Sequence, residues 1–201
     1  MKKIFSVVIG CNYANTPYAL DGCINDAMDF SWTITDLCEK RGFHLSLNLL
    51  LDNGGNSPTK SNIMNNIKQG ISSVNSKQSD LFIFYFAGHG LQHKDTNGDE
   101  ADGLDETILC SDLQQIVDDQ MFLALTRLHK NRQAIFVFDC CHSGTMLDLP
   151  KTMIGGGKSG RMRLSGDVLC VSACLENQKS TEKNGRGLFT SALCATLRKR
   201  G

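Results

Sequence analysis

The chain has 201 residues, 41% of them apolar and 21% charged, a composition that excludes wholesale disorder and suits one domain around a single core. Lysine plus arginine and aspartate plus glutamate both number 21, so the net charge is zero and no basic field would draw the chain to nucleic acid or to an anionic membrane. No stretch stays apolar for long enough to span a bilayer, and we predict no membrane association.

Strands and helices are predicted to alternate, because apolar β-rich runs alternate with segments of helical periodicity. The predicted strands are residues 4–11, 44–51, 81–87, 105–110, 134–138 and 168–172. The predicted helices are residues 21–40, a helix capped by Ser57 with Pro58 as its first residue, residues 119–130 and residues 187–199. Strands that are apolar on both faces predict an α/β fold, a mostly parallel central sheet with helices on both faces. Ligands of such sheets bind beyond the carboxyl ends of the strands.

Nine cysteines form a high and odd count, and no CxxC pair occurs among them. Zinc sites usually need tighter ligand pairs, and a disulfide framework usually needs an even number. We therefore predict reduced, mostly buried thiols and a cytoplasmic protein.

Polar clusters follow two of the apolar strands. The first is Phe86-Ala87-Gly88-His89-Gly90, and the second is Asp139-Cys140-Cys141-His142-Ser143-Gly144. A thiol nucleophile needs a nearby imidazole and backbone N–H groups aimed at the developing oxyanion, for which the amides of Gly90 and Cys141 are candidates. His89 precedes Cys141 by 52 residues, close to the spacing of about 50 in caspases. The alternative is that both are core residues beside tight turns.

The two clusters together resemble the metacaspases. Further stretches agree with that family, namely residues 10–13, 20–26, 102–106, 116–119 and 172–174, so the resemblance runs from about residue 4 to residue 197. It implies a caspase-like fold and a cysteine endopeptidase with Cys141 as nucleophile and His89 as acid–base partner. Strand alternation places Cys140 on the opposite side from Cys141, as a core thiol.

The resemblance also implies cleavage of protein or peptide substrates after Arg or Lys. The positions that match the family's specificity pocket are Cys23, Asp26, Ala87 and Asp139. Two carboxylates suit a guanidinium or ammonium group, and Ala87 departs from the serine often found there. The alternatives are a solvated Asp26 in the first turn of a helix and a loop-organising Asp139.

The chain is predicted to be a single caspase-like domain over residues 1–201, with a large-subunit-like part at 1–148 and a short small-subunit-like part at 167–201. Residues 149–166 read as a flexible, glycine-rich basic linker. Its basic residues are candidate self-cleavage sites for an enzyme of this specificity: Lys151, Lys158, Arg161 and Arg163. The alternative is a solvated basic loop.

Nine carboxylates lie between residues 95 and 119, and such clustered hard oxygens favour calcium as a regulatory cofactor, with magnesium second. An EF-hand is rejected because Glu100 stands where the loop needs glycine and because both flanks read as strands. The resemblance implies Asp102, Asp118, Asp119 and Asp148 as ligands, with Asp99 and Asp105 as rivals for the first of these. The alternatives are helix capping and a solvated acidic loop. We predict no organic cofactor.

Two other functions compete with the peptidase. One is a catalytically silent caspase-like module that binds partners, and the other is a different hydrolase built on the same cysteine–histidine pair. Metacaspase domains usually continue beyond residue 201, so this chain is expected to be either a compact form or a fragment. We expect a monomer, since no exposed apolar helix stripe indicates a dimer.

Overall fold

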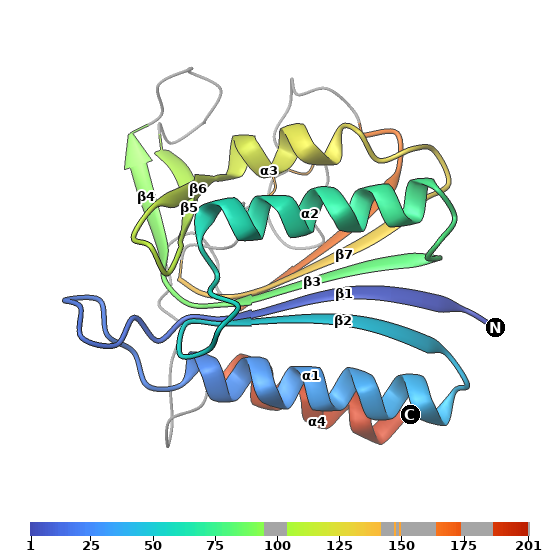
Figure 1. The fold of residues 1–201 in the computed structure, drawn as a ribbon, viewed down its shortest axis with the longest axis horizontal. Coiled ribbons are helices and arrows are strands. Elements are labelled where there is room, and N and C mark those ends of the chain that lie inside the picture. The colour runs from blue at the N-terminus through green and yellow to red at the C-terminus, as the bar shows by residue number, and fades with distance from the viewer. Residues whose placement is uncertain (95–103, 142–146, 148, 150–163, 174–186, 201) are drawn as a thin grey trace.

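The computed structural model describes residues 1–94, 104–141, 147, 149, 164–173 and 187–200 (Figure 1). Its strands are β1 (Lys3–Gly10), β2 (His44–Leu51), β3 (Leu81–Ala87), β4 (Gly90–Lys94), β5 (Leu104–Leu109), β6 (Gln115–Val117), β7 (Gln133–Asp139) and β8 (Asp167–Ser172). Its helices are α1 (Cys23–Lys40), α2 (Lys60–Asn75), α3 (Asp118–Leu125) and α4 (Leu188–Arg200). None of the described helices is both long and apolar enough to cross a membrane.

The central sheet has the order β2-β1-β3-β7-β8, and every neighbouring pair in it is parallel. Helices α2 and α3 cover one face, and α1 and α4 cover the other (Figure 1). The predicted α/β architecture is therefore confirmed. A second, antiparallel sheet of β4, β5 and β6 lies beyond the carboxyl ends of the parallel strands.

Alternation along the strands divides the core between the two faces of the sheet. On β3, Phe82 and Phe84 belong to one buried cluster, whereas Tyr85 and Ala87 belong to the other. Side chains of a strand point alternately to opposite faces, so an unbroken apolar run fills both layers. Each fully buried phenylalanine stabilises the fold by about 1.5–3 kcal/mol. Tyr85 stacks on Phe30 of α1, with ring centroids 4.3 Å apart, which fixes α1 against the sheet.

Two predicted helix boundaries are wrong. Helix α2 begins at Lys60 with Thr59 as its cap, because the Thr59 hydroxyl accepts a hydrogen bond from the Asn62 amide at 3.2 Å. The Ser57 hydroxyl instead donates to the Gly54 carbonyl. Helix α3 ends at Leu125 rather than at residue 130, since the chain tightens into turns with backbone bonds to the residue three before.

Strands β4 and β6 lie outside the predicted strand ranges, although β4 falls in a flank of the acidic stretch that was expected to have strand character. The strand character expected on both sides of residues 95–103 is confirmed, since β4 and β5 pair there in antiparallel fashion. The rejection of an EF-hand therefore agrees with the structure, because an EF-hand needs helices in those positions.

Candidate active site

The two polar clusters leave neighbouring parallel strands at the same level. Ala87 at the end of β3 pairs in register with Asp139 at the end of β7. His89 and Cys141 each follow two residues later, so the sheet delivers them side by side at its carboxyl edge. A Cβ atom on Gly90 would lie 1.9 Å from the carbonyl oxygen of Cys141, so the two segments are in direct contact. Only glycine fits at residue 90.

The imidazole of His89 is oriented by the loop that precedes α1. Its Nε2 lies 2.8 Å from the carbonyl oxygen of Tyr18. A carbonyl oxygen only accepts hydrogen bonds, so Nε2 carries the proton of the neutral ring and Nδ1 is the basic nitrogen. The residue pattern assigned no role to Tyr18, because a backbone carbonyl leaves no signature in a sequence.

A second tyrosine fixes the backbone at the histidine. The hydroxyl of Tyr13 accepts from the His89 amide at 3.1 Å and donates to the Leu109 carbonyl at 2.7 Å. Burial raises the pKa of Tyr13 well above its ordinary value, so the phenol keeps the proton that it donates. Its ring lies 5.2 Å from the imidazole, centroid to centroid. Tyr13 therefore ties the His89 turn to the end of β5.

The described cysteines are all free thiols, as predicted, and they differ in exposure. Cys141 is partly exposed, whereas Cys140 is buried on the other side of the strand, which confirms it as a core thiol. Burial raises the pKa of Cys110 and of Cys170 to about 12. Such thiols stay protonated at neutral pH and are poor nucleophiles.

The four predicted pocket residues come together beside this pair. Cys23 and Ala87 share one buried cluster, and Asp26 and Asp139 are only 3% and 5% exposed. Asp26 is therefore buried rather than solvated. Helix α1 reaches this position because Gly10 lets the Cys23 carbonyl approach; a Cβ there would lie 2.6 Å from that oxygen.

Both carboxylates bind the start of α4, Asp139 at its first turn and Asp26 at the residue that precedes the helix. Both oxygens of Asp26 accept from the Gly187 amide, at 3.0 and 2.9 Å. Asp139 Oδ2 accepts from the amide of Thr190 at 3.2 Å and from its hydroxyl at 2.6 Å. No property of the sequence had indicated Gly187 or Thr190 as members of the site.

Comparison with known proteins identifies the family. The family profile described as the metacaspase, peptidase C14 domain matches residues 4–150. The chain belongs to the metacaspase family. This assignment confirms the resemblance carried by the two polar clusters.

Curated metacaspases align over most of the chain. Metacaspase-1 of Schizosaccharomyces pombe is 37% identical over 93% of this chain and 46% of its own length. Metacaspase-2 of Arabidopsis thaliana is 32% identical over 88% of this chain and 46% of its own length. Metacaspase-2 of Trypanosoma brucei brucei is 31% identical over 94% and 58%. The chain thus spans about half the length of the curated relatives that it matches.

Solved structures confirm the caspase-like fold. A crystal structure of a Geobacter sulfurreducens protein has a TM-score of 0.71 at 22% identity and covers all of this chain and 83% of that one. Caspase-1 of Spodoptera frugiperda has a TM-score of 0.63 at 16% identity, with 98% of this chain and 69% of that one covered. At these identities the likeness concerns the fold alone.

The predicted calcium ligands are only partly described. Asp118 is buried, and its Oδ1 accepts from the Asp119 amide at 2.7 Å, in the first turn of α3. Asp102 and Asp148 lie outside the described residues, and among those that are described no group of three metal-ligating side chains occurs. A set of four aspartates suits a hard cation, but two adjacent carboxylates need further ligands to hold one. The four candidate self-cleavage residues of the linker also lie outside the described part of the chain.

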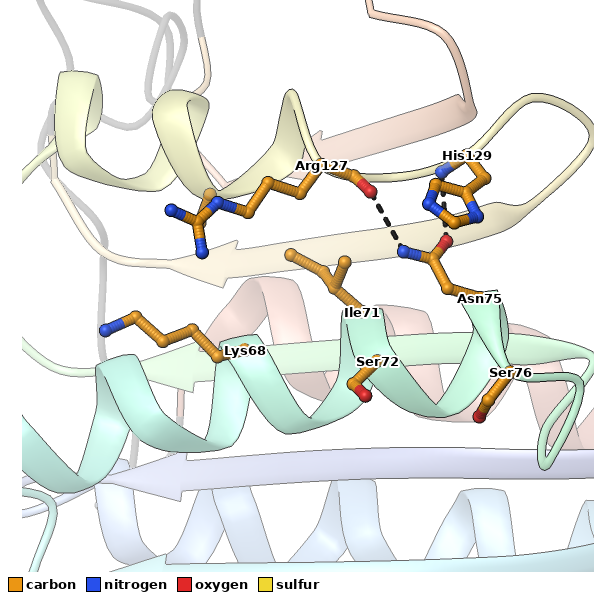
Figure 2. A pocket seen from close by; sticks show the side chains of 8 residues that line it. Lys68, Ile71, Ser72, Asn75, Ser76, Arg127 and His129 are labelled. Atoms are coloured by element: carbon orange, nitrogen blue, oxygen red, sulfur yellow. Dashed lines mark hydrogen bonds between the residues drawn. The ribbon is translucent and has the colours of Figure 1, made fainter.

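A hollow of about 440 Å³ lies between α2 and α3, on the other layer of the molecule (Figure 2). Asn75 closes one end of it, since its amide donates to the Arg127 carbonyl and its oxygen accepts from the His129 amide, both at 2.9 Å. Lys68 and Arg127 extend towards the opposite end. The described residues that line the hollow include neither a cysteine nor a carboxylate. This lining therefore supplies no thiol nucleophile.

Proposed function

We propose that the chain is a cysteine endopeptidase that cleaves after Arg or Lys, with Cys141 as nucleophile and His89 as acid–base partner. The observation that carries the proposal is the delivery of both residues to one sheet edge by two strands in register. The contact between Gly90 and Cys141 brings their segments together, and the Tyr18 carbonyl sets the tautomer of the histidine.

The dyad performs hydrolysis in two halves. His89 Nδ1 takes the thiol proton, and the Cys141 sulfur attacks the scissile carbonyl while the amides of Gly90 and Cys141 stabilise the oxyanion. The imidazolium then protonates the leaving amine, and a thioester remains on Cys141. Water attacks the thioester with His89 again as base, and the acid product leaves as the thiol regains its proton. Tyr18 serves both halves because it holds the ring in one tautomer.

Two buried carboxylates support a basic substrate residue. A Cβ atom added to Gly187 would lie 2.9 Å from one oxygen of Asp26 and 2.6 Å from one oxygen of Asp139. These two oxygens are therefore at most 5.5 Å apart. Two ionised carboxylates at that distance repel by about 3 kcal/mol at an effective dielectric constant of about 20. A guanidinium or ammonium group placed between them relieves this repulsion, whereas an acidic residue adds to it.

Calcium regulation and self-cleavage complete the proposal. A bound Ca²⁺ would neutralise carboxylates at Asp118 and Asp119 and order the loops near the site, with Asp102 and Asp148 as the expected remaining ligands. Cleavage within residues 149–166, at Lys151, Lys158, Arg161 or Arg163, is expected from the same specificity. We place the protein in the cytoplasm as a monomer, where its thiols stay reduced.

The test uses fluorogenic peptides that differ only in a final Arg, Lys or Asp, each assayed with calcium and with chelator. We expect cleavage after Arg and Lys that needs calcium and is lost in Cys141→Ala and His89→Ala. Cys170→Ala is the matched control, since it removes a thiol of raised pKa and should keep activity. Mass spectrometry of the incubated chain locates any self-cleavage. A folded protein that cleaves none of the peptides would favour the silent binding module.

A further inference from the structure

The first turn of α4 joins both carboxylates of the proposed pocket to one rigid element. We propose that Thr190 is a positioning residue for substrate specificity, which aims Asp139 at the basic side chain of the substrate and is itself held by Tyr85. This inference rests on the proposed function, since it concerns the same pocket. Thr190 and Tyr85 are both completely buried, so neither contacts solvent.

The direction of each hydrogen bond follows from the chemistry of the three groups. The Thr190 hydroxyl lies 2.6 Å from Asp139 Oδ2 and gives its single proton to that oxygen. The Tyr85 hydroxyl lies 2.5 Å from the Thr190 oxygen and must therefore donate to it. Burial, with the charge of Asp139 as a further cause, raises the pKa of Tyr85 well above its ordinary value, so this donor keeps its proton. The result is a one-way chain from Tyr85 through Thr190 to Asp139.

This chain fixes one oxygen of Asp139 against the first turn of α4. Thr190 donates to that oxygen twice, through its amide and through its hydroxyl. Two hydrogen bonds to Oδ2 restrict rotation of the Asp139 carboxylate. Two carboxylates held rigidly by one helix turn present a preorganised site for a planar cation.

Gly187 allows both carboxylates to lie close to the backbone at the start of α4. Its amide anchors Asp26, and a side chain at this residue would collide with Asp26 and Asp139. The residues at the start of α4 therefore orient both carboxylates. A positioning role for Thr190 predicts an effect on charge recognition and none on the nucleophile.

The experiment compares two reagents that alkylate Cys141, followed by mass spectrometry of the full chain. One is an arginyl chloromethyl ketone peptide, which must use the pocket, and the other is iodoacetamide, which need not. In Thr190→Val, whose side chain has the same shape without the hydroxyl, we expect the preference for the arginyl reagent to fall by roughly ten- to a hundredfold, the range for a hydrogen bond to a charged group. The iodoacetamide rate should stay within twofold of wild type.

Three variants serve as controls. Thr190→Ser retains the hydroxyl and should restore the preference to within about threefold of wild type. Thr196→Val makes the same change at an exposed position of the same helix and should have no effect. Tyr85→Phe keeps the ring that stacks on Phe30 and removes only the outer donor, so it should lower the preference less than Thr190→Val does.

The outcomes separate this inference from the proposed function. A wild-type protein without preference for the arginyl reagent would contradict the pocket itself. A wild-type preference that persists in Thr190→Val and Tyr85→Phe would overturn the positioning role and leave the pocket intact. Should Thr190→Val fail to fold by circular dichroism, Tyr85→Phe decides the question alone.

Discussion

Gly90→Ala tests most directly whether the turn at His89 and the segment at Cys141 act as one unit. The Cβ of the alanine would lie 1.9 Å from the carbonyl oxygen of Cys141 and 3.0 Å from its carbonyl carbon. The nearest atoms belong to backbone, so they cannot swing aside as a flexible side chain would. Either the Cys141 backbone or the start of β4 must move.

The required movement is large on the scale of catalysis. A carbon–oxygen contact needs roughly 3.3 Å, so the two segments must separate by more than about 1 Å. Misplacement of about 1 Å costs on the order of a hundredfold in rate. We therefore expect kcat of Gly90→Ala to fall by about a hundredfold or more. The central sheet, built from other residues, should keep its fold.

The assay is hydrolysis of the arginyl peptide, with circular dichroism to verify folding. Gly55→Ala is the matched control, since no atom lies within 4 Å of its added Cβ and its backbone is not in the left-handed region. Activity of Gly90→Ala within threefold of wild type would refute the reasoning, because it would show that the contact with Cys141 does not constrain the reacting groups.

Three further predictions concern stability. Tyr13→Phe removes a hydroxyl that bridges two backbone groups, one of them the His89 amide, and should lower the free energy of unfolding by about 1–3 kcal/mol in a urea titration, with a fall in kcat. Cys110 has a pKa of about 12 in the fold against an ordinary 9.0, so only the unfolded chain loses this proton above pH 9. Stability should therefore fall by up to about 1.4 kcal/mol per pH unit between pH 9 and 12, with a shallower slope in Cys110→Ala. Arg198→Ala removes a partly exposed ion pair with Asp29 and should lower the free energy of unfolding by at most about 1 kcal/mol, and by less at high salt. A larger loss would mean that the aliphatic stem of Arg198 packs into the core.

The layer architecture could be predicted because each central strand carries its own signal. The run from Leu81 to Ala87 is apolar on both faces, and only a sheet covered on both sides can bury it. The same signal placed the two polar clusters at strand ends, and the structure shows that β3 and β7 are neighbours with Ala87 opposite Asp139. The proposed catalytic pair was therefore accessible from the sequence.

Other features depend on contacts that no local pattern records. The strand β4 begins at Gly90, one residue after His89, and its five residues carry no alternation that marks a strand. The N-cap of α2 is Thr59 and not the predicted Ser57. Both residue types suit an N-cap, and only the tertiary position of the turn decides between them. Tyr18 acts through a backbone carbonyl, which every residue possesses.

The proposed pocket shows why its full membership could not be predicted. Asp26 lies in the first turn of α1, Asp139 ends β7, and Gly187 precedes α4. These segments meet because α1 and α4 pack side by side on one face of the sheet. The family resemblance indicated the two aspartates, whereas Gly187 contributes a backbone amide, which no sequence pattern records.

The packing of α1 against α4 thus has two separable effects, one on stability and one on substrate preference. At the far end of α4, the contact of Arg198 with Asp29 fastens the helix at its surface, and its loss should change stability without changing substrate preference. At the start of α4, Gly187 and Thr190 hold the two carboxylates. Substitutions there should change substrate preference by more than any loss of stability can explain. Rotation of α4 about its axis would disturb the carboxylate contacts long before it unfolded the helix. Specificity in this metacaspase is therefore expected to depend on the angle at which one helix meets the sheet edge, and comparison of variants at the two ends of α4 measures that dependence.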